Sequence, residues 1–370
     1  MPKLTYSLTI GALPASSDLI EAIRRIEVET HIGLASMVRI RFATGLSSDG
    51  GSWSVLDDAG FDRLTKLSVK VQCGSGSSTL INAQVIEVRP MLTAKPRESY
   101  VDVIAMDATV SMNLEHKVRP WANMSDSSIA SMIFAEHGLK PVVDTTQPVH
   151  QESDVVTMQR GGDAQFLRRL AARNGFEMYV AADPLLGIDE GHFHAPKVDG
   201  TPQGVLTVGA GSEANVDSFE LRHDLLRPAK VSAPGLDWRT LQSQAASVDQ
   251  TALTRLGASP ESDRRSLRAS GSGLSETGEL QGFAQSLADR AAWAVSCEGE
   301  IAGVTYGDVI RPGLPINVRG AGTSFSGTYY VERVLHVISG DGYKQKFTLK
   351  RNALGVRLTD TFVETGAVSV

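Results

Sequence analysis

The chain of 370 residues has few of the residues that mark several common classes of protein. Two cysteines, Cys73 and Cys297, are too few for a disulfide framework or a cysteine metal cage. We expect both to be small buried apolar residues in a protein that folds in a reducing compartment. Aromatic residues make up only 6% of the chain, which disfavours a free-standing carbohydrate-binding protein with exposed aromatic rings.

Long apolar runs and an excess of positive charge are also missing. No run approaches the roughly 20 apolar residues that cross a bilayer, so we expect no membrane insertion. Residues 1–20 contain one lysine and a broken apolar patch, which predicts a strand and a turn rather than a signal peptide. The net charge of −6 argues against specific binding of nucleic acid.

The chain is instead rich in short alternating segments separated by glycine, of which there are 35. Hydrophobic residues make up 42% and charged residues 21%, as in a folded globular protein. The length is too great for one ordinary core and predicts two or three domains. Alternation with a period of two predicts that most of the secondary structure is β-strand.

Residues 1–110 predict a first β-barrel domain. About six short strands separated by turns suit a closed barrel or a sandwich, and a tight glycine turn lies at 74–78. The alternating segments are 23–30, 37–42, 67–72, 80–88 and 100–105. Asp107 follows the last of them, and we expect its side chain to cap the next turn by bonding to the backbone.

Residues 111–200 change period and predict a mixed α/β domain. Ser125 is the cap signal of a helix that ends near His137. A second helix is expected over 164–174, because its apolar residues share one face and Gly175 follows it.

Residues 201–355 return to alternation and predict a second β-barrel domain, which an insertion at about 237–298 interrupts. Up to about residue 273 the insertion is polar and poor in aromatic residues, so we expect an exposed segment, partly helical or mobile. A helix is expected over 280–295, and residues 356–370 form a C-terminal tail.

The clearest hairpin lies in residues 325–355. Tyr343, Gln345, Phe347 and Leu349 alternate with lysines after the glycine turn at 339–342. Residues 307–320 predict a strand, a type II turn at Pro312–Gly313 and another strand. The chain therefore closes with a meander of at least four strands. The predicted fold class is β-rich α+β, with two similar β-barrel domains and a mixed α/β domain between them.

His192 and His194 are the first candidates for chemistry. The two imidazoles are two residues apart on one side of a strand, a spacing that some zinc sites use. Only Asp189 and Glu190, on the preceding turn, could add ligands, so we favour a surface strand end over a metal site.

Other candidates also have a simpler explanation. Residues 208–214 (VGAGSEA) mimic a dinucleotide fingerprint, but residues 215–221 alternate as a strand where the motif requires a helix. Glu136 and His137 could act as acid and base, although helix capping by the histidine explains them as well. Basic side chains are expected on solvated faces or at contacts between subunits: Arg168, Arg169, Lys344, Lys346 and Lys350.

The sequence contains no Gly-x-Ser-x-Gly elbow, Walker loop or HExxH motif. Because each candidate above has a simpler structural interpretation, we predict no catalytic, cofactor-binding or metal-binding residues and no cofactor.

Several of these stretches together resemble a known family. Residues 327–336 read Gly-x-Tyr-x-Val-x-x-Val-x-His between the Pro312–Gly313 turn and a glycine turn with a final strand. This order resembles the end of phage late-control protein D and tail baseplate hub proteins, and of the hub part of type VI secretion spike (VgrG-like) proteins. Residues 166–180 (FLRRLAARNGFEMYV) match the family's aromatic-Leu-x-x-Leu helix, glycine and strand, and Asp107 matches an aspartate after its front strands. The resemblance covers most of the chain.

The resemblance implies a structural baseplate hub of a contractile injection system or phage tail, not an enzyme. Three protomers with two barrels each would form a homotrimeric ring with approximate sixfold symmetry. Such a ring joins a hexameric inner tube protein above to a trimeric spike below and contacts other baseplate proteins.

Residues 356–370 show no needle repeats, so we expect the spike to be a separate polypeptide. The protein would be cytoplasmic on synthesis and then part of the baseplate of a phage tail or an injection particle. The alternative function is a tail-associated cell-wall hydrolase, which would need an acidic pair or a metal site in a cleft of the middle domain.

Overall fold

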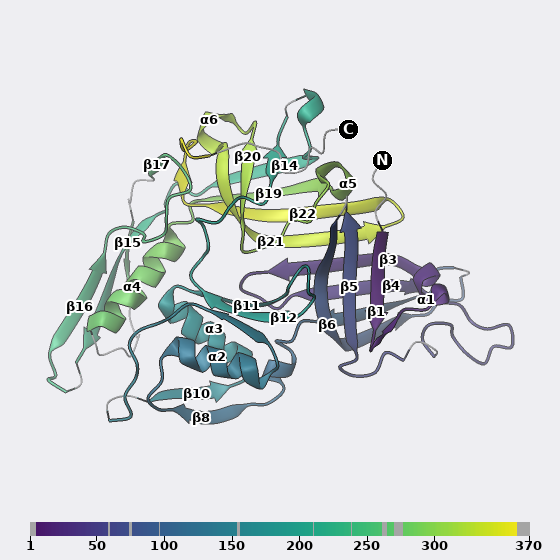
Figure 1. The fold of residues 1–370 in the computed structure, drawn as a ribbon, viewed down its shortest axis with the longest axis horizontal. Helices are drawn as coiled ribbons and strands as arrows, with labels where there is room; N and C mark the ends of the chain where they lie inside the picture. Colours follow the sequence, from purple (N-terminus) through teal and green to yellow (C-terminus); the bar gives the residue numbers. More distant parts are fainter. Residues whose placement is uncertain are drawn as a thin grey trace.

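The computed structural model describes residues 5–360 except 58–59, 74–75, 96, 154–155, 210, 238, 261–264 and 270–276. Parts of the predicted turn at 74–78, most of the polar run that begins at Glu261, and the tail from residue 361 therefore lie outside the described residues. The predicted fold class is confirmed: the described chain is β-rich α+β, with two β units and a mixed α/β unit between them in the sequence (Figure 1).

The first β unit contains one helix that the sequence analysis did not predict. The elements are β1 (Thr5–Ile10), β2 (Leu13–Pro14), α1 (Ser17–Ala22), β3 (Ile23–His31), β4 (Met37–Ala43), β5 (Lys66–Cys73), β6 (Gly76–Met91) and β7 (Tyr100–Met106). Helix α1 begins after Ser16, whose hydroxyl accepts a hydrogen bond from the backbone of Leu19 at 3.3 Å.

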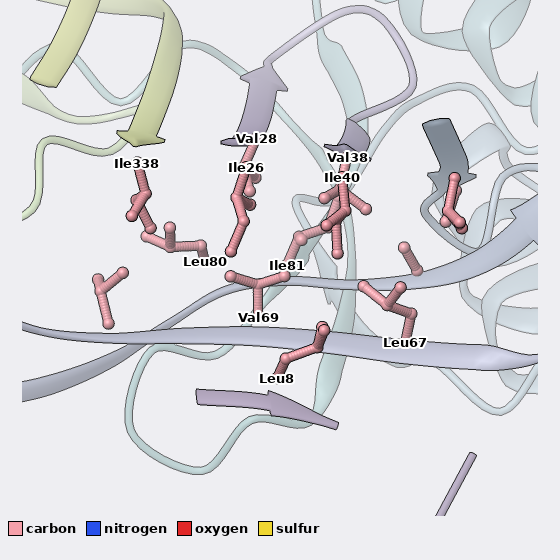
Figure 2. Packing of buried hydrophobic residues seen from close by; sticks show 14 of the residues in the cluster. Leu8, Ile26, Val28, Val38, Ile40, Leu67, Val69, Leu80, Ile81 and Ile338 are labelled. Atoms are coloured by element: carbon pink, nitrogen blue, oxygen red, sulfur yellow. The ribbon is translucent and has the colours of Figure 1, made fainter. Parts of the chain in front are cut away.

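The strands of this unit curl around one core. In Figure 1, β1, β5 and β6 cross over β3 and β4, so that the inner faces of the two groups of strands meet. Figure 2 shows Leu8 and Val69 from one group opposite Ile26 and Ile40 from the other. Ile338, near the other end of the chain, packs into the same core.

The second β unit continues the sheet of the first. Its strands are β13 (Val205–Thr207), β14 (Ser218–His223), β19 (Val295–Ala302), β20 (Pro315–Arg319), β21 (Gly327–Ser339) and β22 (Gly342–Arg351). Strand β21 pairs with β22 on one side and with β3 on the other, from Arg333 opposite His31 to Ser339 opposite Arg25.

The result is one 13-stranded sheet in the order β14-β19-β22-β21-β3-β4-β7-β6-β5-β1-β2, with β20 attached to β21 and β13 to β20. The two predicted barrels are thus joined edge to edge.

The closing hairpin is confirmed, but the strand predicted just upstream is wrong. On β22, Gln345 and Phe347 are buried while Lys344 and Lys346 point outward. Residues 307–311 form no strand because the Gln345 side chain forms hydrogen bonds with their backbone groups. Its Oε1 accepts from the Ile310 N–H and its Nε2 donates to the Asp308 carbonyl, both at 2.8 Å. Strand β19, which precedes β20 in the chain, lies beside β22 instead, so the meander contains the three strands β20, β21 and β22 rather than at least four.

The middle unit contains both predicted helices. Its elements are η1 (Ser111–Asn113), β8 (Lys117–Trp121), α2 (Asp126–Glu136), β9 (Lys140–Val143), β10 (Thr157–Gly161), α3 (Asp163–Asn174), β11 (Glu177–Ala182) and β12 (Asp189–His194). Ser125 caps α2 by accepting from the Ser128 N–H at 3.2 Å. Gly175 ends α3 with φ of +71°, which glycine adopts without a Cβ clash.

Most described residues of the early insertion are exposed or half-buried, but they form strands where the sequence analysis expected a partly helical or mobile segment. Strands β15 (Ala229–Leu236), β16 (Ser243–Val248) and β18 (Arg265–Arg268) form a sheet of their own, covered by helix α4 (Thr277–Ala291) (Figure 1). Val231, Ala233, Val248 and Leu280 share its core. Alanine and serine dominate these strands, so their alternation in hydrophobicity is weak. The smaller elements are η2 (Gly211–Glu213), β17 (Ser259–Pro260), α5 (Gly303–Tyr306), α6 (Gly322–Phe325) and β23 (Ala353–Leu354).

Candidate functional site

The two β units and the middle unit meet around a cavity of about 230 Å³. Its walls come from β6, from β11 and β12, from the loop at 309–314 and from β21. Four of the chain's eight histidines line it: His31, His192, His194 and His336. They come from three distant parts of the sequence, and only the pairing of β21 with β3 and the packing of the middle unit bring His31, His336 and the pair His192 and His194 together.

His192 and His194 lie in this wall, so the expectation of a surface strand end is wrong. His194 is only 1% exposed. Its Nδ1 lies 2.8 Å from the Ala195 carbonyl, which can only accept, so the Nδ1 nitrogen carries the proton. His194 Nε2 must then accept, and His192 Nδ1 donates to it at 3.2 Å. The ring of Tyr179 stacks on His192 with centroids 4.4 Å apart.

Burial keeps this pair uncharged at neutral pH. Burial is the largest cause that lowers the pKa of His192 to about 3, and the charges of His194, Lys197 and Lys140 contribute to the same shift. Burial also lowers the pKa of His194, although its bond to Ala195 opposes that shift. Two neutral imidazoles could serve as metal ligands, which makes the other ligands the deciding question.

Among the residues that the structure describes, no group of three His, Cys, Asp or Glu side chains is placed to hold a metal ion. Glu190 Oε2 lies 3.5 Å from His192 Nε2, but Glu190 Oε1 is paired with Lys140 Nζ at 2.7 Å. Asp189 Oδ1 accepts a hydrogen bond from Asn82 Nδ2 at 2.9 Å. Both acidic residues that the sequence offers as further ligands therefore have other partners.

Asp107 has the capping role that the sequence predicts. Its Oδ1 accepts from the Thr109 N–H at 2.9 Å, and its Oδ2 accepts from the Ser36 N–H at 2.6 Å. Burial raises the pKa of Asp107, while its hydrogen bonds to Thr109 and Ser36 oppose the shift. Arg168 is half-buried and the Asp107 charge acts on it, so the prediction of a solvated face is wrong for Arg168.

The remaining candidates are structural contacts. Strand β13 is followed by the short 3-10 helix η2 and then strand β14, so the glycines at 209 and 211 do not begin an α-helix. His137 Nε2 lies 2.7 Å from Asp163 Oδ2, and Glu136 Oε1 accepts from Arg119 Nη1 at 2.8 Å.

The lysines of β22 divide into two groups. Lys344 and Lys346 are exposed and both pair with Glu300, Lys346 at 3.1 Å. Lys350 is only 14% exposed and lies 3.6 Å from Glu177 and 4.7 Å above the Trp293 ring. The expectation of a solvated face is therefore wrong for Lys350.

Sequence reasoning missed Arg311 and Tyr179 as lining residues of the cavity, and it noted His336 only as part of the resemblance. Each of these residues lies in a strand or turn. The local sequence pattern there can indicate burial, but it cannot indicate which distant segment the residue faces.

The edges of the 13-stranded sheet are the places where another chain could add a strand. Strand β14 ends the sheet on one side, and no strand pairs with its outer edge among the described residues. Its Ser218, Glu220 and Arg222 are exposed. At the other end β2 has two residues, one of which is Pro14 and cannot donate a backbone hydrogen bond. Strand β14 is thus the more open edge.

No α-helix in the described part of the chain has the length and apolar character needed to span a bilayer.

Comparisons with known proteins relate the fold to tail proteins. A family model described as the Alg8 N-terminal domain matches residues 16–340. A search of curated proteins gave no match. The fold is similar to a tail protein from Neisseria meningitidis, with 13% identity and a TM-score of 0.66 over 95% of this chain and 98% of that one.

Two further solved structures are similar over most of their length. The 43 kDa tail protein of prophage MuSo2 from Shewanella oneidensis has 15% identity and a TM-score of 0.61, over 95% of this chain and 100% of that one. The c3393 protein of E. coli, a component of the type VI secretion system, has 14% identity and a TM-score of 0.54, over 94% and 76%. At these identities the likeness establishes the fold.

Proposed function

The chain belongs to the Alg8 N-terminal domain family, and from its fold we propose that it is a structural baseplate hub of a contractile injection system or phage tail. The hub is a homotrimer in the baseplate that joins a hexameric inner tube protein to a separate trimeric spike. We divide it at 1–110, 111–200, 201–355 and 356–370, and we assign it no catalytic, cofactor or metal site.

The observation that carries this proposal is the antiparallel pairing of β21 with β3, which unites two β units of one chain in a single sheet. Three such chains supply six β units, enough to meet each subunit of a hexameric tube. The same three chains have the symmetry of a trimeric spike. A chain with two β units therefore resolves a mismatch that a chain with one could not.

The outer edge of β14 is our candidate for the contact between protomers. This strand has six residues, and its exposed side chains are polar. A polar surface is typical of an interface that forms between chains that have already folded. A second copy could add a strand there without rearranging the sheet.

Oligomeric state is the first test. Size exclusion with light scattering should give three times the chain mass of 39.6 kDa, and the baseplate should show threefold density at this position. Glu220→Lys should reduce the trimer fraction by placing like charge beside Arg222 on the edge. Glu115→Lys, the same change at an exposed residue of the middle unit, should not. Only monomer at high concentration, together with a particle without threefold density there, would refute the hub.

Binding partners are the second test. The tube and spike proteins encoded beside this chain should each co-purify with it. Hydrolysis of peptidoglycan by the purified protein would instead support the alternative, a tail-associated hydrolase.

A further inference from the structure

Arg311 brings a positive charge to the wall of the cavity between the three units. Its Nη2 donates to Ser78 Oγ at 2.6 Å, and its backbone N–H donates to Gln203 Oε1 at 2.8 Å. Burial lowers the pKa of the guanidinium, and the charges of Asp308 and Asp183 partly oppose this. Neither carboxylate forms an ion pair with Arg311, and no other carboxylate does so within the described ranges. A partly buried cation that is not directly paired with a carboxylate is a favourable partner for an incoming anion.

His336 adds an unused hydrogen-bond donor to the same cavity. It is 2% exposed, and its Nδ1 lies 2.8 Å from the Tyr343 hydroxyl. The buried Tyr343 hydroxyl has no other hydrogen-bond partner among the described residues, so it donates its proton to Nδ1. The imidazole proton is therefore on Nε2, which has no acceptor in the part of the chain that the structure describes. Arg311 and His336 both line this cavity, and the Arg311 charge also acts on His336.

The acidic side chains of the cavity have other partners than Arg311 and His336. Asp107 is bonded to Ser36 and Thr109, Asp189 to Asn82, and Glu190 to Lys140. Lys197 also lines the cavity, and it is exposed. Among the other polar groups of the wall, the Arg311 guanidinium, the His336 N–H and the Lys197 ammonium are all suited to an anion.

The rest of the wall sets the shape of the ligand. Leu80, Ile81, Val180, Val309 and Ile310 are among the residues that line it. A cavity of about 230 Å³ has room for a small organic molecule. A simple inorganic ion would leave the apolar wall without contacts.

We propose that this cavity binds a small organic carboxylate with an apolar body, whose carboxylate accepts hydrogen bonds from Arg311 and His336. The body of the ligand then contacts β6, β11 and the loop at 309–314, which belong to three different units. Binding would therefore hold the units in one arrangement. The site is independent of the hub assignment, because it lies inside one chain.

Benzoate is a suitable probe for the full-length protein. We expect calorimetry to show saturable binding of benzoate at one site, and thermal unfolding to shift to higher temperature. Benzyl alcohol has the same body without the charge, and acetate has the charge without the body, so both should bind at least about tenfold more weakly.

Matched variants locate the site. Arg311→Gln should weaken benzoate binding at least about tenfold, because it removes the charge-assisted hydrogen bonds. Arg89→Gln, at an exposed arginine outside the cavity, should leave it unchanged. Absence of saturable binding at millimolar benzoate, equal affinity of wild type and Arg311→Gln, or equal binding of acetate and benzoate would each overturn the proposal.

A crystal of the wild-type protein soaked in 4-bromobenzoate keeps the proposal testable if Arg311→Gln does not fold. Anomalous bromine signal inside the cavity would support the proposal, and signal only elsewhere, or none, would overturn it. Neither result bears on the oligomeric state, which is measured separately.

Discussion

The hydroxyl of Tyr330 donates a hydrogen bond to Glu177 Oε2 at 2.6 Å and so joins β21 to β11 of the middle unit. Lys350 Nζ lies 3.6 Å from the other carboxylate oxygen, and the Trp293 ring stacks on Tyr330 with centroids 5.8 Å apart. Burial raises the pKa of Glu177, while Lys350 and Tyr330 oppose the shift. One buried carboxylate therefore ties together the middle unit and the second β unit.

Tyr330→Phe should lower the free energy of unfolding by about 1–3 kcal/mol, because it removes a hydrogen bond from a buried carboxylate. Chemical denaturation would measure the loss. Tyr100→Phe is the matched control, since the Tyr100 hydroxyl has no hydrogen bond to the described residues and its ring stays over Arg41. Equal stability of Tyr330→Phe and wild type would show that the contact contributes nothing.

Acid should destabilise the protein below about pH 6.5. His192 and His336 have pKa values of about 3 in the folded protein, against an ordinary value of 6.5. Between these values the unfolded chain binds protons that the folded chain does not, so lower pH favours unfolding. Each histidine should lower the free energy of unfolding by about 1.4 kcal/mol per pH unit in this window.

Denaturation at several pH values between about 7 and 5 would measure this slope, above the range where most carboxylates titrate. The groups that act on His192 are His194, Lys197 and Lys140, and Arg311 acts on His336. His192→Gln should reduce the slope, whereas His116→Gln, at an exposed histidine, should not. A slope that is the same in all three proteins would contradict the prediction.

Ala284→Asp should unfold the small sheet of the insertion and leave the 13-stranded sheet intact. Ala284 is fully buried against β15 and β16, so a carboxylate there would be desolvated without a partner. Hydrogen exchange should lose protection in residues 229–291 and keep it in β21 and β22. Gln281→Asp adds the same charge on the exposed face of α4 and should change neither region.

Val334→Asp should prevent folding of the whole chain. Val334 is fully buried on β21, which pairs with both β22 and β3. The new charge would thus break the core where the two β units join. Soluble yield and thermal unfolding would be compared with those of Ser7→Asp, an exposed position on β1. Folding of both variants to the same extent would show that this join is not essential.

Removal of metal should change nothing. Because Asp189 and Glu190 already have partners beside His192 and His194, dialysis against EDTA should leave the melting temperature unchanged. Elemental analysis should find no stoichiometric zinc. A melting temperature that falls with EDTA and recovers with zinc would reverse this conclusion.

Local signals predicted the elements that depend on local chemistry. The cap at Ser125, the left-handed Gly175 and the lysine alternation of β22 each act within a few residues, and each is found in the structure. Residues 307–311 looked like a strand, but the side chain of Gln345 satisfies their backbone groups. That partner is more than 30 residues away, where a local pattern gives no information.

The sites that sequence reasoning missed depend on distant partners. His192 and His194 have the alternation of a surface strand, and only the packing of Tyr179 and the loop at 309–314 buries them. Ala233 and Ala246 are too small to reveal the core of the insertion by their hydrophobicity. The burial of Arg311 and His336 likewise follows from where three units meet.

The pairing of β3 with β21 also governs how the protein is made. Thr30 donates a hydrogen bond to the Val334 carbonyl, from a position 304 residues earlier in the chain. While the ribosome is still translating, β3 can pair with β4 but its other edge has no partner. This exposed edge invites association with other nascent chains until the last tenth or so of the polypeptide emerges. Chains that terminate before β21 should therefore be strong substrates for chaperones and proteases.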